Sequence, residues 1–141
     1  MTSVKWDSHS SNVESARTSS VSFRTSDDFR LAGLITLPKK LNGIVLLAHG
    51  MMVGKDEYGG LYAELAVRLA QIGFASLRFD FRGHGDSSGT ARDISVLNEV
   101  LDTKAAYRYL AAHFRLPIDC VATSFGAPPT KIVRGGGFSS F

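Results

Sequence analysis

Short apolar segments alternate with amphipathic ones over most of this 141-residue chain. One apolar run occupies positions 44–48 between Gly43 and Gly50, and a second occupies positions 74–79. A third run, at 117–121, leads into the sequence Ala-Thr-Ser-Phe-Gly. Runs of this length that are rich in branched side chains are typical of strands buried on both faces of a sheet.

Two longer segments have the spacing of amphipathic helices. The first ends at Gly73, a residue that suits a helix C-terminus, and its apolar stripe comprises Leu61, Leu65, Leu69 and Ile72. The second is predicted over positions 94–114, with Asp93 as its N-cap. Its apolar stripe comprises Leu97, Leu101, Ala105, Tyr109 and Ala112.

The part of the chain before these segments has two different patterns. Residues 1–20 are rich in serine and lack periodicity, which predicts a loose extension. From Val21 onward, the pattern predicts two strands joined by a polar turn at 26–28, the second ending at Pro38. The alternation of strands and helices that follows predicts an α/β domain over 21–127, with a mostly parallel sheet covered by helices on both faces.

Composition limits the classes of function. The chain is 44% hydrophobic and has a net charge of +3, with no dense basic cluster, so we expect no nucleic-acid partner. No apolar run approaches the roughly 20 residues of a membrane helix. The single cysteine, Cys120, allows no internal disulfide, and we expect no metal or cofactor. The lack of a secretory signal pattern favours a cytoplasmic location.

Ser124 lies between two small residues, Ala122 two positions before it and Gly126 two positions after it. After a strand, this spacing predicts a nucleophile elbow, a sharp turn that raises a serine hydroxyl above the sheet. The motif alone is weak evidence, because small-x-Ser-x-Gly also arises by chance. Two further loops, at 49–54 and 80–89, also follow strands, and the carboxyl ends of parallel strands meet where α/β active sites form.

The segments His49–Met51, Arg78–Gly89 and Ser124–Gly126 together resemble the α/β-hydrolase superfamily. Within it, the serine aminopeptidase and lysophospholipase-like branch is the most similar, with the bacterial cinnamoyl and feruloyl esterases near it. The resemblance covers residues 21–127 and implies a three-layer α/β-hydrolase fold.

The same resemblance implies roles for individual residues. Ser124 would be the nucleophile, and the backbone N–H groups of Met51 and Phe125 would form the oxyanion hole. His49 would shape the oxyanion loop without acting as the base, and His84 would pack within its turn. In this family the catalytic acid and histidine follow the serine along the chain.

Two segments of the sequence partly resemble phosphate-binding motifs, but neither matches fully. Residues 50–55 resemble a phosphate loop, but only three residues separate the glycines, and Asp56 stands where Ser or Thr would bind magnesium. Residues 83–88 resemble a dinucleotide fingerprint, but Ser88 replaces its third glycine. Cys120 is read as a small buried hydrophobe.

The pattern breaks after Ala127. Pro128 and Pro129 follow directly, and three glycines stand at 135–137, so residues 128–141 are expected to form an irregular tail outside the family pattern. The acid and histidine of the triad would then lie beyond residue 141, which predicts a truncated or frame-shifted chain. The strand before Ser124 would become an exposed sheet edge, which predicts self-association.

These observations leave three hypotheses about function. The first is a serine hydrolase that cleaves carboxylic ester or amide bonds of small substrates through an acyl-enzyme at Ser124. The second is a catalytically inactive remnant or pseudo-enzyme that acts as a binding or interaction module. The third is a small-molecule-binding protein that uses the fold without hydrolysis.

Overall fold

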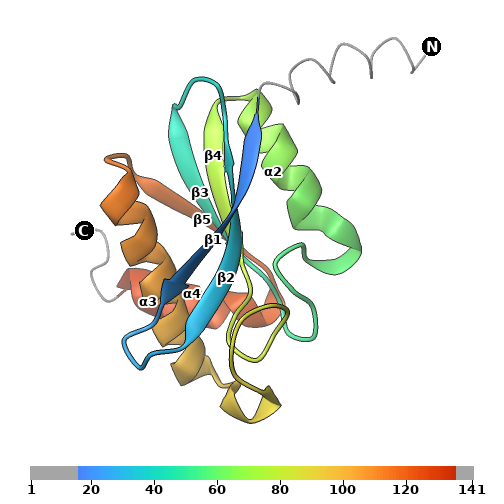
Figure 1. Ribbon diagram of the computed structural model, residues 1–141, viewed down its shortest axis with the longest axis vertical. Helices are drawn as coiled ribbons and strands as arrows, with labels where there is room; N and C mark the ends of the chain where they lie inside the picture. Colours follow the sequence, from blue (N-terminus) through green and yellow to red (C-terminus); the bar gives the residue numbers. More distant parts are fainter. Residues whose placement is uncertain (1–15, 136–141) are drawn as a thin grey trace.

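The computed structural model describes residues 16–135, which form one five-stranded mixed sheet with helices on both faces (Figure 1). The strand order is β1-β2-β4-β3-β5. The strands are β1 (Arg17–Arg24), β2 (Arg30–Leu37), β3 (Gly43–Ala48), β4 (Phe74–Phe79) and β5 (Ile118–Ala122). β3 runs parallel to both β4 and β5, whereas β1 and β2 form an antiparallel hairpin whose second strand pairs with β4.

The helices divide between the two faces of the sheet (Figure 1). α2 (Leu61–Gln71) covers one face, and α3 (Val96–His113) and α4 (Ala127–Gly135) pack together on the other. Three short 3-10 helices lie in the loops, namely η1 (Tyr58–Gly60), η2 (Ala91–Asp93) and η3 (Ser124–Gly126). Among the described residues, no helix is long and apolar enough to span a membrane.

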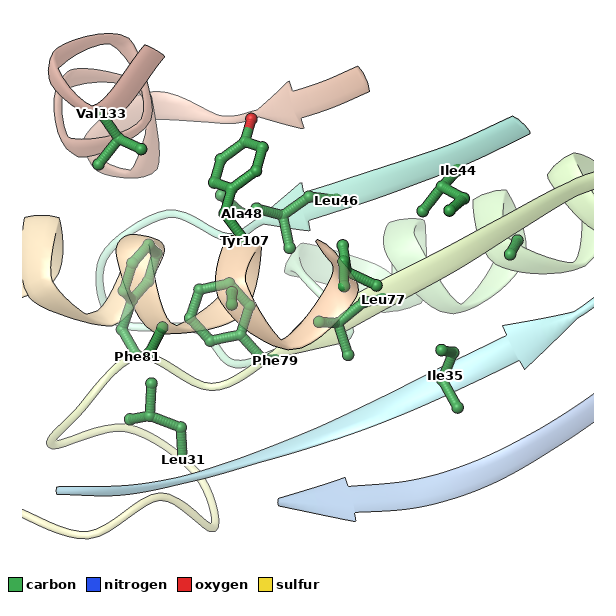
Figure 2. Packing of buried hydrophobic residues seen from close by; sticks show 14 residues of the cluster. Leu31, Ile35, Ile44, Leu46, Ala48, Leu77, Phe79, Phe81, Tyr107 and Val133 are labelled. Carbon is green, nitrogen blue, oxygen red and sulfur yellow. The ribbon is translucent and has the colours of Figure 1, made fainter. Parts of the chain in front are cut away.

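β3 shows why its apolar run must be a central strand. All six of its residues are buried, since successive side chains of a strand point to opposite faces and both faces are covered. Ile44, Leu46 and Ala48 join the core under α3 and α4, whereas Val45 and Leu47 pack with α2. Figure 2 shows the larger core, which extends from Leu31 and Ile35 to Tyr107 and Val133.

Both long helices form where the sequence predicts them, but only part of each predicted stripe contacts the core. On α2, Leu61 and Ile72 are exposed, and the buried residues are Tyr62 and Ala66. On α3, Leu97 is 76% exposed, and the buried face includes Glu99, Asp102 and Thr103. The prediction is therefore confirmed for Leu65 and Leu69 of α2 and for Ala105 and Tyr109 of α3, which pack on the core, and it is wrong for the ends of both stripes.

Two boundaries also differ from the predictions. β1 begins at Arg17, inside the predicted extension, and residues 1–15 lie outside the described part. α3 begins after Ser95, whose hydroxyl accepts a hydrogen bond from Asn98 N, so Asp93 is not its N-cap. Asp93 instead completes a capping box with Thr90 that ends the preceding loop.

Residues 127–135 form a helix, although an irregular tail was expected from residue 128. Pro128 and Pro129 occupy its first turn, where backbone N–H groups have no partner within the helix, so proline is tolerated there. The Thr130 hydroxyl donates to Gly126 O at 2.9 Å, and Val133 is buried in the core. The remaining predicted tail, 136–141, lies outside the described residues.

Candidate active site

Ser124 sits at the sharp turn between β5 and α4. Its φ is 47°, a left-handed conformation that is uncommon for a non-glycine residue. Thr123 N donates to Ala48 O at 3.1 Å, and Gly126 N donates to Thr123 O at 2.9 Å, so the turn is pinned to β3 and closed on itself. The side chain of Ser124 is exposed at the carboxyl end of the parallel strands. This is the geometry that the elbow motif predicts.

Position 126 requires a glycine because the backbone at the end of β3 lies against it. A Cβ at this position would stand 2.4 Å from His49 O and 2.7 Å from Ala48 O. These are backbone atoms of a central strand and the residue after it, which cannot move aside. The requirement for a small residue two positions after the serine therefore has a direct steric cause.

The loop that follows β3 contacts this elbow. A Cβ at Gly50 would lie 3.4 Å from Ser124 Cβ and 3.6 Å from Thr123 O, so the two segments meet at Gly50. Met51 comes next and is 42% exposed, and Phe125 is half-buried beside Ser124. The structure thus brings the predicted oxyanion loop and the predicted nucleophile together.

His49 is a structural residue of this loop. Phe81 N donates to its Nε2 at 3.0 Å, so its proton is on Nδ1, which contacts Gly50 O at 2.6 Å. Burial lowers the pKa of His49, and the hydrogen bond to Gly50 opposes that shift only in part. Both ring nitrogens are occupied and the ring is buried, so His49 cannot take a proton from Ser124.

Glu57 links the two segments, and the sequence patterns did not single it out. Its Oε1 accepts from Gly50 N at 2.8 Å and from the Thr123 hydroxyl at 2.5 Å. Tyr62, fully buried on α2, contacts the same hydroxyl at 2.8 Å. An acidic residue inside a polar loop gives no periodic signal, so only the fold reveals this contact.

Asp80 organises the loop after β4. Its carboxylate accepts from Lys55 N at 2.7 Å, from Lys55 Nζ at 2.9 Å and from Asp86 N at 3.0 Å. A Cβ at Gly85 would meet that carboxylate at 2.4 Å, and Gly85 has a φ of 47°. Asp80 thus holds the Gly-rich turn against the loop that follows β3.

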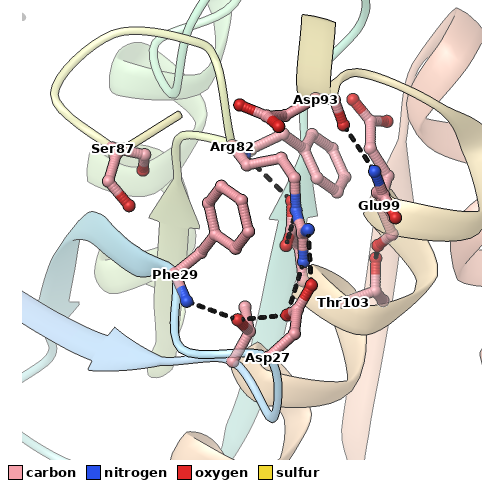
Figure 3. A network of polar contacts seen from close by, with 12 residues as sticks. Asp27, Phe29, Arg82, Ser87, Asp93, Glu99 and Thr103 are labelled. Carbon is pink, nitrogen blue, oxygen red and sulfur yellow. Dashed lines mark hydrogen bonds and ion pairs between the residues drawn. The ribbon is translucent and has the colours of Figure 1, made fainter. Parts of the chain in front are cut away.

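Arg82 anchors the same turn from the other side (Figure 3). Its Nε donates to Asp102 on α3 at 2.8 Å, and its terminal nitrogens donate to both oxygens of Asp27 at 2.7 and 2.9 Å. The guanidinium also lies 4.0 Å from the centre of the Phe29 ring. The hydrogen bond from Arg82 lowers the pKa of Asp27 to about 2, so this pair is ionised at neutral pH.

The remaining histidines that the structure describes do not serve Ser124. His84 packs edge-on against His49, with ring centres 4.9 Å apart, as expected of a residue within its turn. His113, near the end of α3, contacts Tyr109 O through Nδ1. Within residues 16–135, no histidine hydrogen-bonds to Ser124, and no group of three His, Cys, Asp or Glu side chains could hold a metal ion.

Comparison with known proteins agrees with this arrangement. Residues 39–128 match the family model described as serine aminopeptidase, S33. A search of curated proteins finds no significant match. Among solved structures, the α/β hydrolase GrgF from Penicillium sp. sh18 has a TM-score of 0.74 at 21% identity, over 83% of this chain and 41% of its own.

Two esterases are similar to the same degree. The Pyrococcus furiosus esterase Pf2001 has a TM-score of 0.74 at 23% identity, over 87% of this chain and 47% of its own. Est1E from Butyrivibrio proteoclasticus, solved with ferulic acid bound, has a TM-score of 0.72 at 21% identity, over 81% of this chain and 47% of its own. The α/β-hydrolase fold is therefore confirmed, and the chain spans less than half the length of these structures.

Proposed function

Because the chain belongs to the serine aminopeptidase S33 family of α/β hydrolases, we propose that it carries the nucleophile of a serine hydrolase. In this proposal Ser124 attacks the carbonyl carbon of a carboxylic ester or amide. The observation that carries it is the left-handed Ser124, raised at the strand ends against the loop at Gly50. The esterase neighbours support a small ester as the substrate class.

The proposed reaction has two halves. The Ser124 oxygen bonds to the carbonyl carbon while a histidine takes the serine proton, and the carbonyl oxygen becomes an anion. The N–H groups of Met51 and Phe125 stabilise that anion. The histidinium then gives its proton to the leaving oxygen or nitrogen, the bond from the carbonyl carbon to that atom breaks, and the alcohol or amine leaves an acyl-enzyme. Water then cleaves the acyl-enzyme by the same steps and restores the hydroxyl.

The base in this scheme comes from outside residues 16–135. His49 and His84 pack in the loops and His113 stands at the far end of α3, so none is placed to serve Ser124. Without a base, hydroxyl activation is lost, although an oxyanion hole and binding alone retain a residual rate, roughly 10³–10⁴-fold over water in a related system. A binding module without catalysis is the second candidate. It is favoured by the same observation, that none of the described histidines contacts Ser124.

An activated ester tests the proposal directly. The chain is incubated with p-nitrophenyl butyrate, and the acylated peptide is located by mass spectrometry. We expect the butyryl group on Ser124 and its absence in Ser124→Ala, whereas Ser22→Ala, at an exposed position of β1, should leave acylation unchanged. Binding of the ester by a folded chain without any adduct at Ser124 would favour the binding module.

We further propose that a second copy of the chain pairs with β5. Among the described strands, β5 stands at the end of the strand order and has β3 as its one strand partner, and edge strands are the usual place where a second chain adds to a sheet. Val121 on this strand is 40% exposed, which adds apolar surface to the edge.

A further inference from the structure

Glu57 connects two segments that are distant in sequence through a single oxygen atom. Its Oε1 accepts one hydrogen bond from Gly50 N at 2.8 Å and one from the Thr123 hydroxyl at 2.5 Å. Gly50 directly precedes Met51, and Thr123 directly precedes Ser124. The carboxylate therefore holds the loop after β3 and the elbow after β5 at a fixed separation.

The backbone of Glu57 is itself constrained to make this contact. Its φ is 62°, which is costly for a residue with a side chain, and its Oε2 accepts from Tyr58 N at 2.8 Å at the start of η1. Gly59 and Gly60, which follow Tyr58, also have positive φ values, of 66° and 76°. A strained acidic residue is thus held in place by a turn that glycines make feasible.

The direction of the hydrogen bond between Thr123 and Glu57 follows from the chemistry of the two groups. The Thr123 hydroxyl has a single proton, and an ionised carboxylate can only accept, so that proton goes to Glu57. The Tyr62 hydroxyl lies 2.8 Å from Thr123 Oγ1 and donates to the carbonyl oxygen of Ala48 at 3.0 Å. Because Tyr62 is fully buried on α2, the chain from Tyr62 through Thr123 to Glu57 ties the elbow to the helix beneath it.

Glu57 cannot itself serve as the base for Ser124. Burial would raise its pKa, but the hydrogen bonds from Thr123, Tyr58 N and Gly50 N outweigh burial, and the net pKa is lowered. A carboxylate that accepts three hydrogen bonds and has a lowered pKa is a poor proton acceptor at neutral pH. Its chemistry therefore suits holding groups in position.

We propose that Glu57 is a positioning residue that sets the spacing of the oxyanion hole, by fixing Gly50 next to Met51 and Thr123 two residues before Phe125. This inference rests on the proposed hydrolase function. Preorganised donors act mainly on the transition state, so their displacement should lower the rate of acylation more than the binding of the ester.

A set of matched variants compares the effect on the acylation rate with the effect on ester binding. The acylation rate constant and the ester dissociation constant are determined with p-nitrophenyl butyrate for the full chain. Glu57→Ala removes every acceptor, and we expect acylation to fall about 100-fold with binding changed less than about twofold. Thr123→Val removes the hydroxyl that contacts Glu57 and Tyr62 but leaves the hydrogen bond from Gly50 N to Glu57, and its acylation rate should fall about 10-fold. Thr123→Ser retains the hydroxyl and should restore the rate. Glu64→Gln, at an exposed position of α2, is the control.

A second readout does not depend on catalysis. In NMR spectra, the amide protons of Gly50 and Tyr58 should shift together on acidification, with one midpoint below the ordinary glutamate range, as Glu57 is protonated. Burial raises the pKa of Tyr62, so Tyr62 stays neutral on acidification, whereas burial lowers the pKa of His49, and any shift that His49 causes would persist in Glu57→Gln. In Glu57→Gln the shared shift should disappear, and Gly50 N–H should exchange with solvent at least 10-fold faster in Glu57→Ala.

The outcomes separate this inference from the proposed function. If wild-type Ser124 is never acylated but the shared titration and the exchange effect are seen, the hydrolase proposal fails and the positioning contact stands. If folded Glu57→Ala and Thr123→Val acylate at the wild-type rate, the positioning role is overturned and the hydrolase proposal stands. If Glu57→Ala does not fold, Thr123→Val and Glu57→Gln take its place. Acylation rates and amide shifts equal to those of wild type in both variants would overturn the inference.

Discussion

At the scale of single residues, the site depends on a few positions where side-chain size or charge is dictated by close neighbours. Ser124 tolerates a positive φ because the turn around it is hydrogen-bonded to β3 and closed by Gly126. Gly126 tolerates no larger side chain because the backbone carbonyl oxygens of Ala48 and His49 lie against it. Ser124 is therefore strained in conformation but held by hydrogen bonds of the turn around it.

Gly126→Ala tests that support. Its methyl group would overlap backbone atoms that cannot shift, so we expect a loss of about 1–3 kcal/mol in the free energy of unfolding, measured with urea. Gly59→Ala is the comparison, since no atom lies within 4 Å of its Cβ and only its φ of 66° is unfavourable. That variant should lose about 1 kcal/mol. A smaller loss for Gly126→Ala than for Gly59→Ala would contradict the steric explanation.

Glu99 is an acid buried without a hydrogen-bond partner. Its side chain is 1% exposed and, within the described residues, neither carboxylate oxygen has a partner. Burial, with the charge of Asp102, raises the pKa of Glu99 to about 8, so the folded chain holds its proton more tightly than the unfolded chain does. This preference stabilises the fold at acidic pH, and the stability is lost as pH rises from the unfolded pKa towards about 8.

Glu99→Gln should remove that dependence. We expect the variant to be more stable than wild type at pH 8 by about 1–4 kcal/mol, with the difference shrinking towards pH 5. Urea unfolding curves at several pH values measure it. A constant difference between the two proteins across this range would show that Glu99 does not titrate as described.

At the scale of elements, the Gly-rich turn after β4 is anchored to α3 by a buried ion pair. Arg82 and Asp102 are 1% and 0% exposed, and Asp102 accepts both Arg82 N at 2.9 Å and Nε at 2.8 Å. Asp27, in the turn between β1 and β2, completes the network. Three elements thus meet at one guanidinium beside the turn that packs on His49.

Asp102→Ala should therefore be strongly destabilising. Removing one partner leaves a buried guanidinium and an unpaired backbone N–H, for which we expect a loss of about 3–5 kcal/mol in unfolding free energy. Asp119→Ala, at an exposed position of β5, is the matched control and should change stability by less than about 0.5 kcal/mol. Similar losses in the two variants would contradict a structural role for the ion pair.

Apolar patterns predict elements well but miss polar contacts between them. The strands at 44–48 and 74–79 were predicted almost to the residue, because their apolar runs are long enough to mark a strand even though Ser76 and Arg78 are buried in the second one. The buried face of α3 was predicted only in part, because Ala105 and Tyr109 contact the core but Asp102 is also buried, through its pairing with Arg82 20 positions away. Pro128 and Pro129 were predicted to prevent the helix that they in fact begin.

Some residues of the candidate site could be predicted from local motifs, and others only from the fold. Ser124 and the loop at His49 could be found from local motifs, and the structure places them in contact around Gly50. The roles of Met51 and Phe125 remain predictions. Glu57 and Tyr62 were missed because their importance arises only when β3, α2 and β5 come together.

At the scale of the whole molecule, the exposed β5 edge predicts self-association. Val121→Lys places a charge on this edge and should weaken dimerisation at least 10-fold in sedimentation equilibrium. Leu97→Lys removes a more exposed apolar residue, 76% exposed on α3, and should leave association unchanged. A wild-type chain that stays monomeric at high concentration, or equal effects of both variants, would contradict pairing through β5.

The central claim is that this chain presents Ser124 as a nucleophile whose base is supplied from elsewhere. Fluorophosphonate labelling with added imidazole tests it most directly, because imidazole can act as the base that no histidine within residues 16–135 is placed to be. We predict slow labelling located at Ser124, faster with rising imidazole concentration and absent in Ser124→Ala. A folded chain that stays unlabelled at every imidazole concentration, or is labelled equally after Ser124→Ala, would contradict the account.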